Sequence, residues 1–175
     1  MENDKTKQDI HMRPGYADPS PYPEVKVTEP NKYYAKIIMD DYAGKISEFT
    51  AISQYLYHDF SMRPKYNELA DILENIAITE MHHMEMLSTI IKLLGYEPVF
   101  QNGANIPWST NYVYYGKNVC DQLRGDLKSE FEAISIYERN IKVIKDPYIQ
   151  DVLRRIILDE KVHVKIFEEQ IKKYC

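Results

Sequence analysis

The sequence predicts an all-α protein, a four-helix bundle with a long crossover between its second and third helices. Apolar residues recur at helical spacing in four segments, at about 32–60, 65–94, 117–144 and 148–174. The connections between these segments are short, long and short. Short connections make antiparallel neighbours, and a long middle connection can return the chain to the other end of the bundle. The second half of the chain also echoes the first at a period near 80 residues.

Local signals justify each element in turn. The first 30 residues carry five prolines, which exclude a helix and predict an extended arm before a bundle at 31–175. Tyr16 and Tyr22 could anchor this arm on the domain or on a neighbouring subunit; a disordered tail is the alternative. The first helix is expected to run through Gly44, although glycine costs about 1 kcal/mol there against alanine. Gly95 is expected to end the second helix as its C-terminal cap.

The crossover at 96–116 contains Trp108 and four tyrosines. Loops of this length are uncommon in compact domains unless they have a role. We therefore expect this loop to cover the bundle or to meet another subunit.

Composition and charge narrow the class of protein. The chain has 175 residues, of which 44% are hydrophobic and 28% charged, as in a globular domain, and its net charge of −5 argues against a nucleic-acid partner. It contains no apolar run that would span a membrane and no secretory signal, so a cytoplasmic location is predicted. Cys120 and Cys175 lie far apart, which predicts no disulfide framework, no zinc knuckle and no rubredoxin-type iron centre. Cys120 is interpreted as an ordinary core residue.

The internal repeat selects a set of acidic and histidine side chains. Residues 47–55 and 129–137 are identical at seven of nine positions, and both halves contain a Glu-x-x-His pair. Residues three apart in a helix project from the same face, so each pair can bind one metal ion. Six residues have partners in the repeat and places on an apolar stripe: Glu48, Glu80, His83, Glu130, Glu160 and His163. Four others lack such partners and are assigned to solvent or to an outer layer: His82, Glu85, Glu132 and Asp159.

A metal centre is expected because unpaired carboxylates are costly inside a helical core. Four glutamates and two neutral imidazoles carry four negative charges, which two divalent cations would neutralise. Carboxylates with one imidazole per ion suit manganese or iron, whereas structural zinc prefers thiolates. One glutamate on each of two helices and Glu-x-x-His on the other two is the known pattern of dinuclear carboxylate bundles. The sequence therefore predicts a site for two manganese or two iron ions.

Two tyrosines follow the unpaired glutamates at the same spacing. Tyr55 and Tyr137 lie seven residues after Glu48 and Glu130, on the same helical face. We interpret them either as core aromatics or as hydrogen-bond donors to metal-bound carboxylates. His58 and His11 have no partner at ligand spacing and are interpreted as structural or exposed.

These residues resemble those of a known family. The chain is similar to the ferritin-like superfamily and, more narrowly, to manganese catalases and their spore-coat relatives. The likeness covers roughly residues 20–172, and it is carried by the arm at 22–27, by Tyr42-Ala43-Gly44 with Glu48, by the segment 80–86, and by Glu130, Tyr137, Asp146-Pro147 and the segment 160–167.

The resemblance implies a ferritin-like bundle whose dinuclear site disproportionates hydrogen peroxide, with Glu48 and Glu130 as catalytic ligands. Rubrerythrins and ferritins share the ligand pattern, but this chain lacks a rubredoxin module. The alternatives are iron oxidation and storage, a structural coat protein with a vestigial site, or an oxidase that uses dioxygen. A homo-oligomer without a membrane or nucleic-acid partner, cytoplasmic or associated with spores, completes the expectation.

Overall fold

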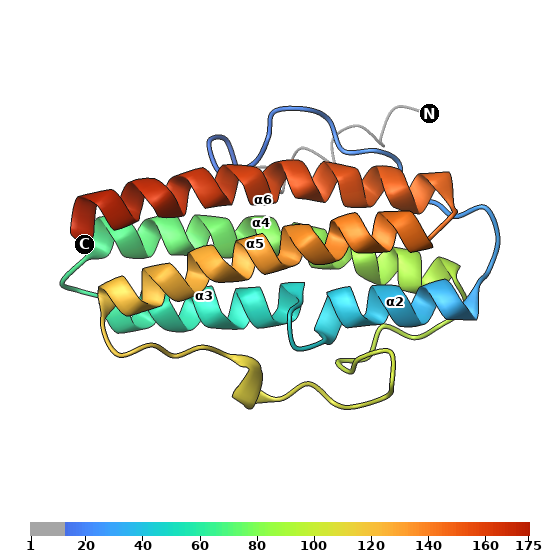
Figure 1. Cartoon of the computed structure of the whole chain (residues 1–175), viewed down its shortest axis with the longest axis horizontal. Helices are drawn as coiled ribbons and strands as arrows, with labels where there is room; N and C mark the ends of the chain where they lie inside the picture. Colours follow the sequence, from blue (N-terminus) through green and yellow to red (C-terminus); the bar gives the residue numbers. More distant parts are fainter. Residues whose placement is uncertain (1–12) are drawn as a thin grey trace, which may run out of the picture.

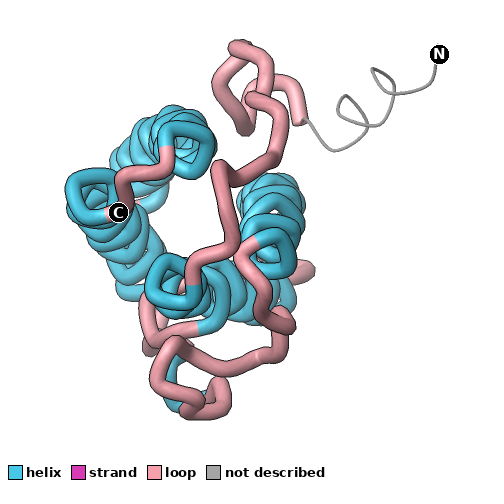
Figure 2. Tube along the Cα trace, turned by 90° about the vertical axis from the view of Figure 1, so that its right-hand side faces the viewer, coloured by secondary structure: helices cyan, strands magenta, loops and turns pink. Residues whose placement is uncertain are grey.

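The computed structural model describes residues 13–175, and within them the regular structure is helical, apart from two isolated bridges. Helices α4 (Asn67–Leu93), α5 (Val119–Val143) and α6 (Pro147–Tyr174) each span the bundle. The remaining side is formed by α2 (Lys32–Ala43) and α3 (Glu48–Met62), which lie end to end (Figure 1). The view along the bundle shows helices at its four corners (Figure 2). The four-helix bundle with a long crossover is thus confirmed.

The first helix differs from the prediction because it is broken at Gly44–Ser47. Gly44 ends α2, and a Cβ atom there would lie 2.4 Å from the Asp40 carbonyl oxygen. Ser47 then caps α3, because its hydroxyl accepts a hydrogen bond from the Thr50 amide. The expectation of one continuous helix at 32–60 was therefore wrong. Gly95 behaves as predicted: it follows α4 with φ +89°, and its amide donates to the Lys92 carbonyl.

The crossover runs along the outside of α2 and α3 and contains a short 3₁₀ helix, η1 (Thr110–Tyr112) (Figure 1). Trp108 donates from its indole to the Thr50 hydroxyl at 2.9 Å, and the Tyr114 amide donates to the Gln54 side chain at 2.9 Å. The loop therefore covers the bundle, which was one of its two expected roles.

The core consists of two apolar clusters with a polar layer between them. On α4, the buried apolar residues between Leu69 and Ala77 belong to one cluster, and those from Met86 to Ile91 belong to the other. On α6, the buried apolar residues between Ile149 and Ile157 belong to one cluster and Phe167 to the other. The Glu-x-x-His pair of each helix lies in the gap between them. The apolar clusters therefore fix the helices on both sides of the polar layer. None of the helices within 13–175 is long and apolar enough to cross a membrane.

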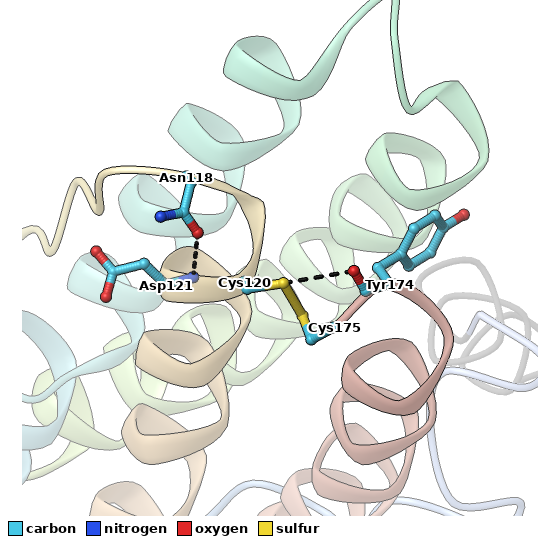
Figure 3. Close-up of a disulfide and its surroundings, with 5 residues drawn as sticks. All are labelled: Asn118, Cys120, Asp121, Tyr174 and Cys175. Carbon is cyan, nitrogen blue, oxygen red and sulfur yellow. Dashed lines mark hydrogen bonds between the residues drawn. A yellow bond between two sulfur atoms is a disulfide. The ribbon is translucent and has the colours of Figure 1, made fainter.

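The two cysteines form a disulfide, which corrects the prediction for both (Figure 3). Because α5 and α6 are antiparallel neighbours, the start of α5 lies beside the end of α6, and the Cα atoms of Cys120 and Cys175 are 5.6 Å apart. Their separation of 55 residues along the chain concealed this proximity. Cys120 is therefore a cross-link and not an ordinary core residue.

Candidate metal centre

The six predicted ligands come from four helices. Glu48 is the first residue of α3, placed there by the break after Gly44, whereas Glu130 lies in the middle of α5. Glu80 and His83 lie one turn apart on α4, and Glu160 and His163 one turn apart on α6. All six side chains belong to residues that are at most 3% exposed. The structure thus brings every predicted ligand into the polar layer.

The six residues form two overlapping groups that could each hold an ion. One group comprises Glu48, Glu80, His83 and Glu160, and the other comprises Glu80, Glu130, Glu160 and His163. Within each group the ligand atoms lie within 4.8 Å of one another. Glu80 and Glu160 belong to both groups. This arrangement suits a dinuclear site in which Glu80 and Glu160 would be shared by the two ions and each ion would also be held by one further glutamate and one histidine.

The two histidines face the glutamates in the same way. His83 Nδ1 lies 2.7 Å from Glu80 Oε2, 3.5 Å from Glu160 Oε1 and 3.7 Å from Glu48 Oε2. His163 Nδ1 lies 3.1 Å from Glu80 Oε1, 3.2 Å from Glu160 Oε2 and 3.7 Å from Glu130 Oε1. The two halves of the repeat therefore present equivalent donor atoms around a common centre.

The buried carboxylates of the cluster would be stabilised by bound cations. Burial raises the pKa of Glu48 and Glu130 well above the usual range, and the neighbouring glutamates raise it further. Burial would lower the pKa of both imidazoles, but the surrounding carboxylates raise it well above the ordinary value. Both oxygens of Glu80 face a histidine Nδ1, Oε2 that of His83 at 2.7 Å and Oε1 that of His163 at 3.1 Å. This set of buried carboxylate oxygens and imidazole nitrogens fits a pair of metal ions.

A layer of hydrogen bonds surrounds the candidate ligands. The Tyr55 hydroxyl on α3 donates to Glu130 on α5, and the Tyr137 hydroxyl on α5 donates to Glu48 on α3. Burial raises the pKa of both tyrosines well above the usual value, so they remain donors. Each tyrosine thus holds the glutamate of the opposite half. Of the two interpretations that the sequence left open for these tyrosines, the structure shows the hydrogen-bond donor.

The far nitrogens of the two histidines have different partners. His83 Nε2 lies 2.9 Å from Asp159 Oδ2, and His163 Nε2 lies 2.8 Å from the Tyr16 carbonyl oxygen in the arm. A carbonyl can only accept, so His163 Nε2 carries a proton, and Nδ1, which faces the glutamates, is the nitrogen that would bind an ion in the neutral imidazole. Burial opposes ionisation of Asp159, but hydrogen bonds from His83 and others lower its pKa to about 2. Sequence reasoning missed the Tyr16 carbonyl as a partner and assigned Asp159 only to solvent or an outer layer.

The other candidates lie outside the cluster. His82 packs edge-on against the Tyr22 ring, and Glu85 is an exposed side chain. His58 is buried between Asp126 and the Tyr114 carbonyl, in a structural position. His11 and the start of the arm lie outside the described residues.

A cavity of about 390 Å³ leads from the glutamates to the surface. It passes between α3 and α5, whose facing residues include Ala51 and Ala133. Its inner lining includes Glu48, Tyr55, Glu80, Glu130, Tyr137 and Glu160, and its outer lining includes the exposed Lys45, Arg124 and Lys128. The side of the cluster formed by Glu48 and Glu130 is therefore open to a small molecule, whereas the histidine side is closed by the arm.

Comparisons with known proteins find relatives among manganese catalases and bacterioferritins. Residues 22–102 match the family model of manganese containing catalase. The chain is 27% identical to the probable manganese catalase of Clostridium acetobutylicum, over 86% of this chain and 75% of that protein. It is 32% identical to the bacterioferritin of Desulfovibrio desulfuricans, over 77% of this chain and 73% of that protein. A manganese catalase from Anabaena, KatB, shares the fold, with a TM-score of 0.81 at 24% identity over 89% of this chain and 78% of that chain.

The bundle, the dinuclear carboxylate cluster and these relatives define the class: the chain belongs to the ferritin-like dimetal proteins. Within that class the chain is similar to manganese catalases, through the family model that matches residues 22–102 and through the clostridial relative.

Proposed function

We propose that the protein is a dinuclear oxidoreductase that disproportionates hydrogen peroxide to water and dioxygen. The observation that carries this proposal is the pair of ligand groups sharing Glu80 and Glu160 at the inner end of a cavity wide enough for a small molecule. When bound, two manganese or two iron ions would supply the two-electron chemistry that this reaction requires. The manganese catalases among its relatives support peroxide as the substrate.

In this proposal each side chain of the site has a role that follows from its position. His83 and His163 would each bind an ion through Nδ1, because their Nε2 atoms are occupied by Asp159 and by the arm. Glu80 and Glu160 would help to hold both ions, since each belongs to both groups.

Glu48 and Glu130 would be terminal ligands and would carry the catalytic proton. Both line the cavity where peroxide would enter, and each is held by a tyrosine hydroxyl. A carboxylate in this position can take a proton from one peroxide oxygen and return it to the other.

The disulfide and the exposed aromatic side chains bear on location and assembly. A cytoplasmic or spore-associated setting was expected, but the disulfide argues against a reducing compartment, where such bonds are rare. We also propose a homo-oligomer, whose interfaces would cover some of the exposed aromatic side chains, such as Tyr33, Phe60 and Phe131, which are between 51% and 68% exposed.

The test is oxygen release from peroxide by the manganese-loaded and the iron-loaded protein. Glu80→Ala should abolish it, because that change removes a ligand from both groups. Glu85→Ala is the matched control, since Glu85 is an exposed glutamate on the same helix. The absence of peroxide consumption with either metal would refute the proposal.

A second candidate function is iron oxidation, favoured by the identity of 32% with a bacterioferritin. It predicts that ferrous ions added with dioxygen are oxidised faster by this protein than in buffer and remain bound beyond two per chain. Retention of only two ions per chain would exclude a storage role.

A further inference from the structure

The outer partners of the two histidines break the symmetry of the repeat. Asp159 directly precedes Glu160 and reaches His83 on the opposite helix. The position that matches Asp159 in the first half is Thr79, directly before Glu80. If the halves were alike, residue 79 would supply a carboxylate to His163. Instead the Tyr16 carbonyl of the arm accepts from His163 at 2.8 Å, and the Thr79 hydroxyl lies 3.4 Å from the same oxygen.

The arm is fixed at this point by several bonds. Tyr16 closes a turn in which its amide donates to the Arg13 carbonyl and Gly15 adopts φ +89°. Further along, the Arg155 guanidinium donates to the Ser20 carbonyl at 2.9 Å and to the Asp18 carbonyl at 2.7 Å.

Asp159 is itself held by the arm. Its Oδ1 accepts from the Asp18 amide at 2.7 Å, and its Oδ2 accepts from the Tyr22 hydroxyl at 2.6 Å. The segment 16–22 therefore contacts His163 directly and His83 through Asp159.

We propose that the arm segment 16–22 is a positioning element of the metal centre, which replaces the carboxylate missing at Thr79 and fixes both ligand histidines with Nδ1 toward the ions. This inference rests on the proposed dinuclear site. The donor of a metal-bound histidine is held in place by the acceptor behind it, and removing such an acceptor weakens metal binding by about 10–100-fold. Docking of the arm and metal binding are therefore coupled in both directions.

Two glycines allow a matched test in the full-length chain. Gly15 and Gly95 both have φ +89°, and a Cβ added at either meets no atom within 4 Å. Alanine at either position therefore introduces similar backbone strain, but only Gly15 lies in the turn that presents Tyr16. We expect Gly15→Ala to release bound manganese to a chelator about tenfold faster than the wild type, and Gly95→Ala to release it at the wild-type rate. Equal rates for the two variants would overturn the role of the arm.

A rescue variant separates positioning from general loosening. Thr79→Asp restores the carboxylate that the repeat lacks, so Gly15→Ala combined with Thr79→Asp should release manganese within about twofold of the wild-type rate. A merely structural defect in the arm would not be rescued by this substitution, and unchanged fast release in the double variant would contradict the proposal.

The reverse coupling provides a readout without activity. Chymotrypsin cleavage after Tyr16 should be about tenfold slower in the manganese-loaded protein than in the metal-free protein. Equal cleavage with and without the ion would refute coupling while leaving the proposed function intact. If manganese and iron both fail to bind the wild type, the dinuclear site itself fails, and the inference about the arm falls with it.

Discussion

The two halves of the repeat build the same ligand geometry from different backbones. In the second half, α5 runs unbroken through Glu130, whereas in the first half the chain breaks at 44–47 and Glu48 opens a new helix. The carboxylates nevertheless occupy equivalent places, each beside one histidine and the two shared glutamates. Ligand position is therefore set by packing around the centre, and the path of the backbone leading to it can differ.

Two buried polar contacts, one around Asp41 and one around Asp126, reflect the same difference in backbone path between the halves. The Asn140 amide donates to both oxygens of Asp41 at 2.9 Å, and the Gln54 amide and His58 contact the two oxygens of Asp126. His58 and Asn140 match in the repeat, but Asp41 lies seven residues before Glu48 whereas Asp126 lies four before Glu130. The break at 44–47 accounts for the additional residues, so each half carries a buried aspartate that pairs with the other half.

The largest expected difference in metal content is between substitutions of Glu80, which belongs to both ligand groups, and of Glu48, which belongs to one. Glu80→Gln removes a ligand from both groups, so the purified protein should contain almost no metal, and oxygen release should fall by about 10³-fold or more. Glu48→Gln removes a ligand from one group only and should leave about one ion per chain. Elemental analysis of both variants checks this. Equal metal content in the two would contradict the assignment of Glu80 as shared.

The pairs Asp41–Asn140 and Asp126–His58 can be compared through pH. Burial raises the pKa of Asp41 to about 8, and burial also raises that of Asp126, where hydrogen bonds from His58 and Gln54 oppose it. Between about pH 4 and pH 8 the unfolded chain ionises Asp41 but the folded chain keeps its proton, so stability falls as pH rises. The Asp41→Asn substitution removes this pH-dependent loss of stability.

We therefore expect the metal-free Asp41→Asn variant to match the wild type near pH 4 and to exceed it by about 2–5 kcal/mol at pH 8. Asp126→Asn should give a gain of the same sign but smaller size, because its folded-state pKa is raised less. Urea unfolding at pH 4, 6 and 8 measures both. Stability curves parallel to that of the wild type would show that Asp41 ionises normally in the folded protein.

The sequence was sufficient to predict the fold and the clustering of the six candidate ligands, because both rest on periodicity. Polar residues on an otherwise apolar stripe that recur in both halves, at offsets of 80 and 82 residues, leave few other interpretations. The break at 44–47 was harder, since Gly44 and a capping serine are weak local signals that packing can override.

Two contacts of the centre depend on tertiary structure alone. The Tyr16 carbonyl has no side-chain signature, because every residue has one, and only the path of the arm brings it to His163. Asp159 was not predicted to contact the centre, because Thr79 occupies the matching position in the first half and the repeat was used to select residues present in both halves. The disulfide likewise depends on α5 and α6 being antiparallel neighbours.

The smallest expected effect concerns the two tyrosines that cross between the halves. Tyr137→Phe and Tyr55→Phe each remove one hydroxyl that donates to a terminal glutamate while keeping the aromatic ring. Each variant should retain two ions and lose about tenfold in the rate of oxygen release. Tyr42→Phe, a buried tyrosine of α2, is the control and should retain the wild-type rate.

The ratio of the two losses decides whether the halves are functionally equivalent. Both tyrosines line the cavity, and each holds the glutamate of the opposite half, so the symmetric arrangement predicts losses that agree within about threefold. If one loss is much larger, the proton passes mainly through the glutamate held by that tyrosine. That outcome would assign the catalytic proton to Glu48 or to Glu130 alone and would make the other a purely structural ligand.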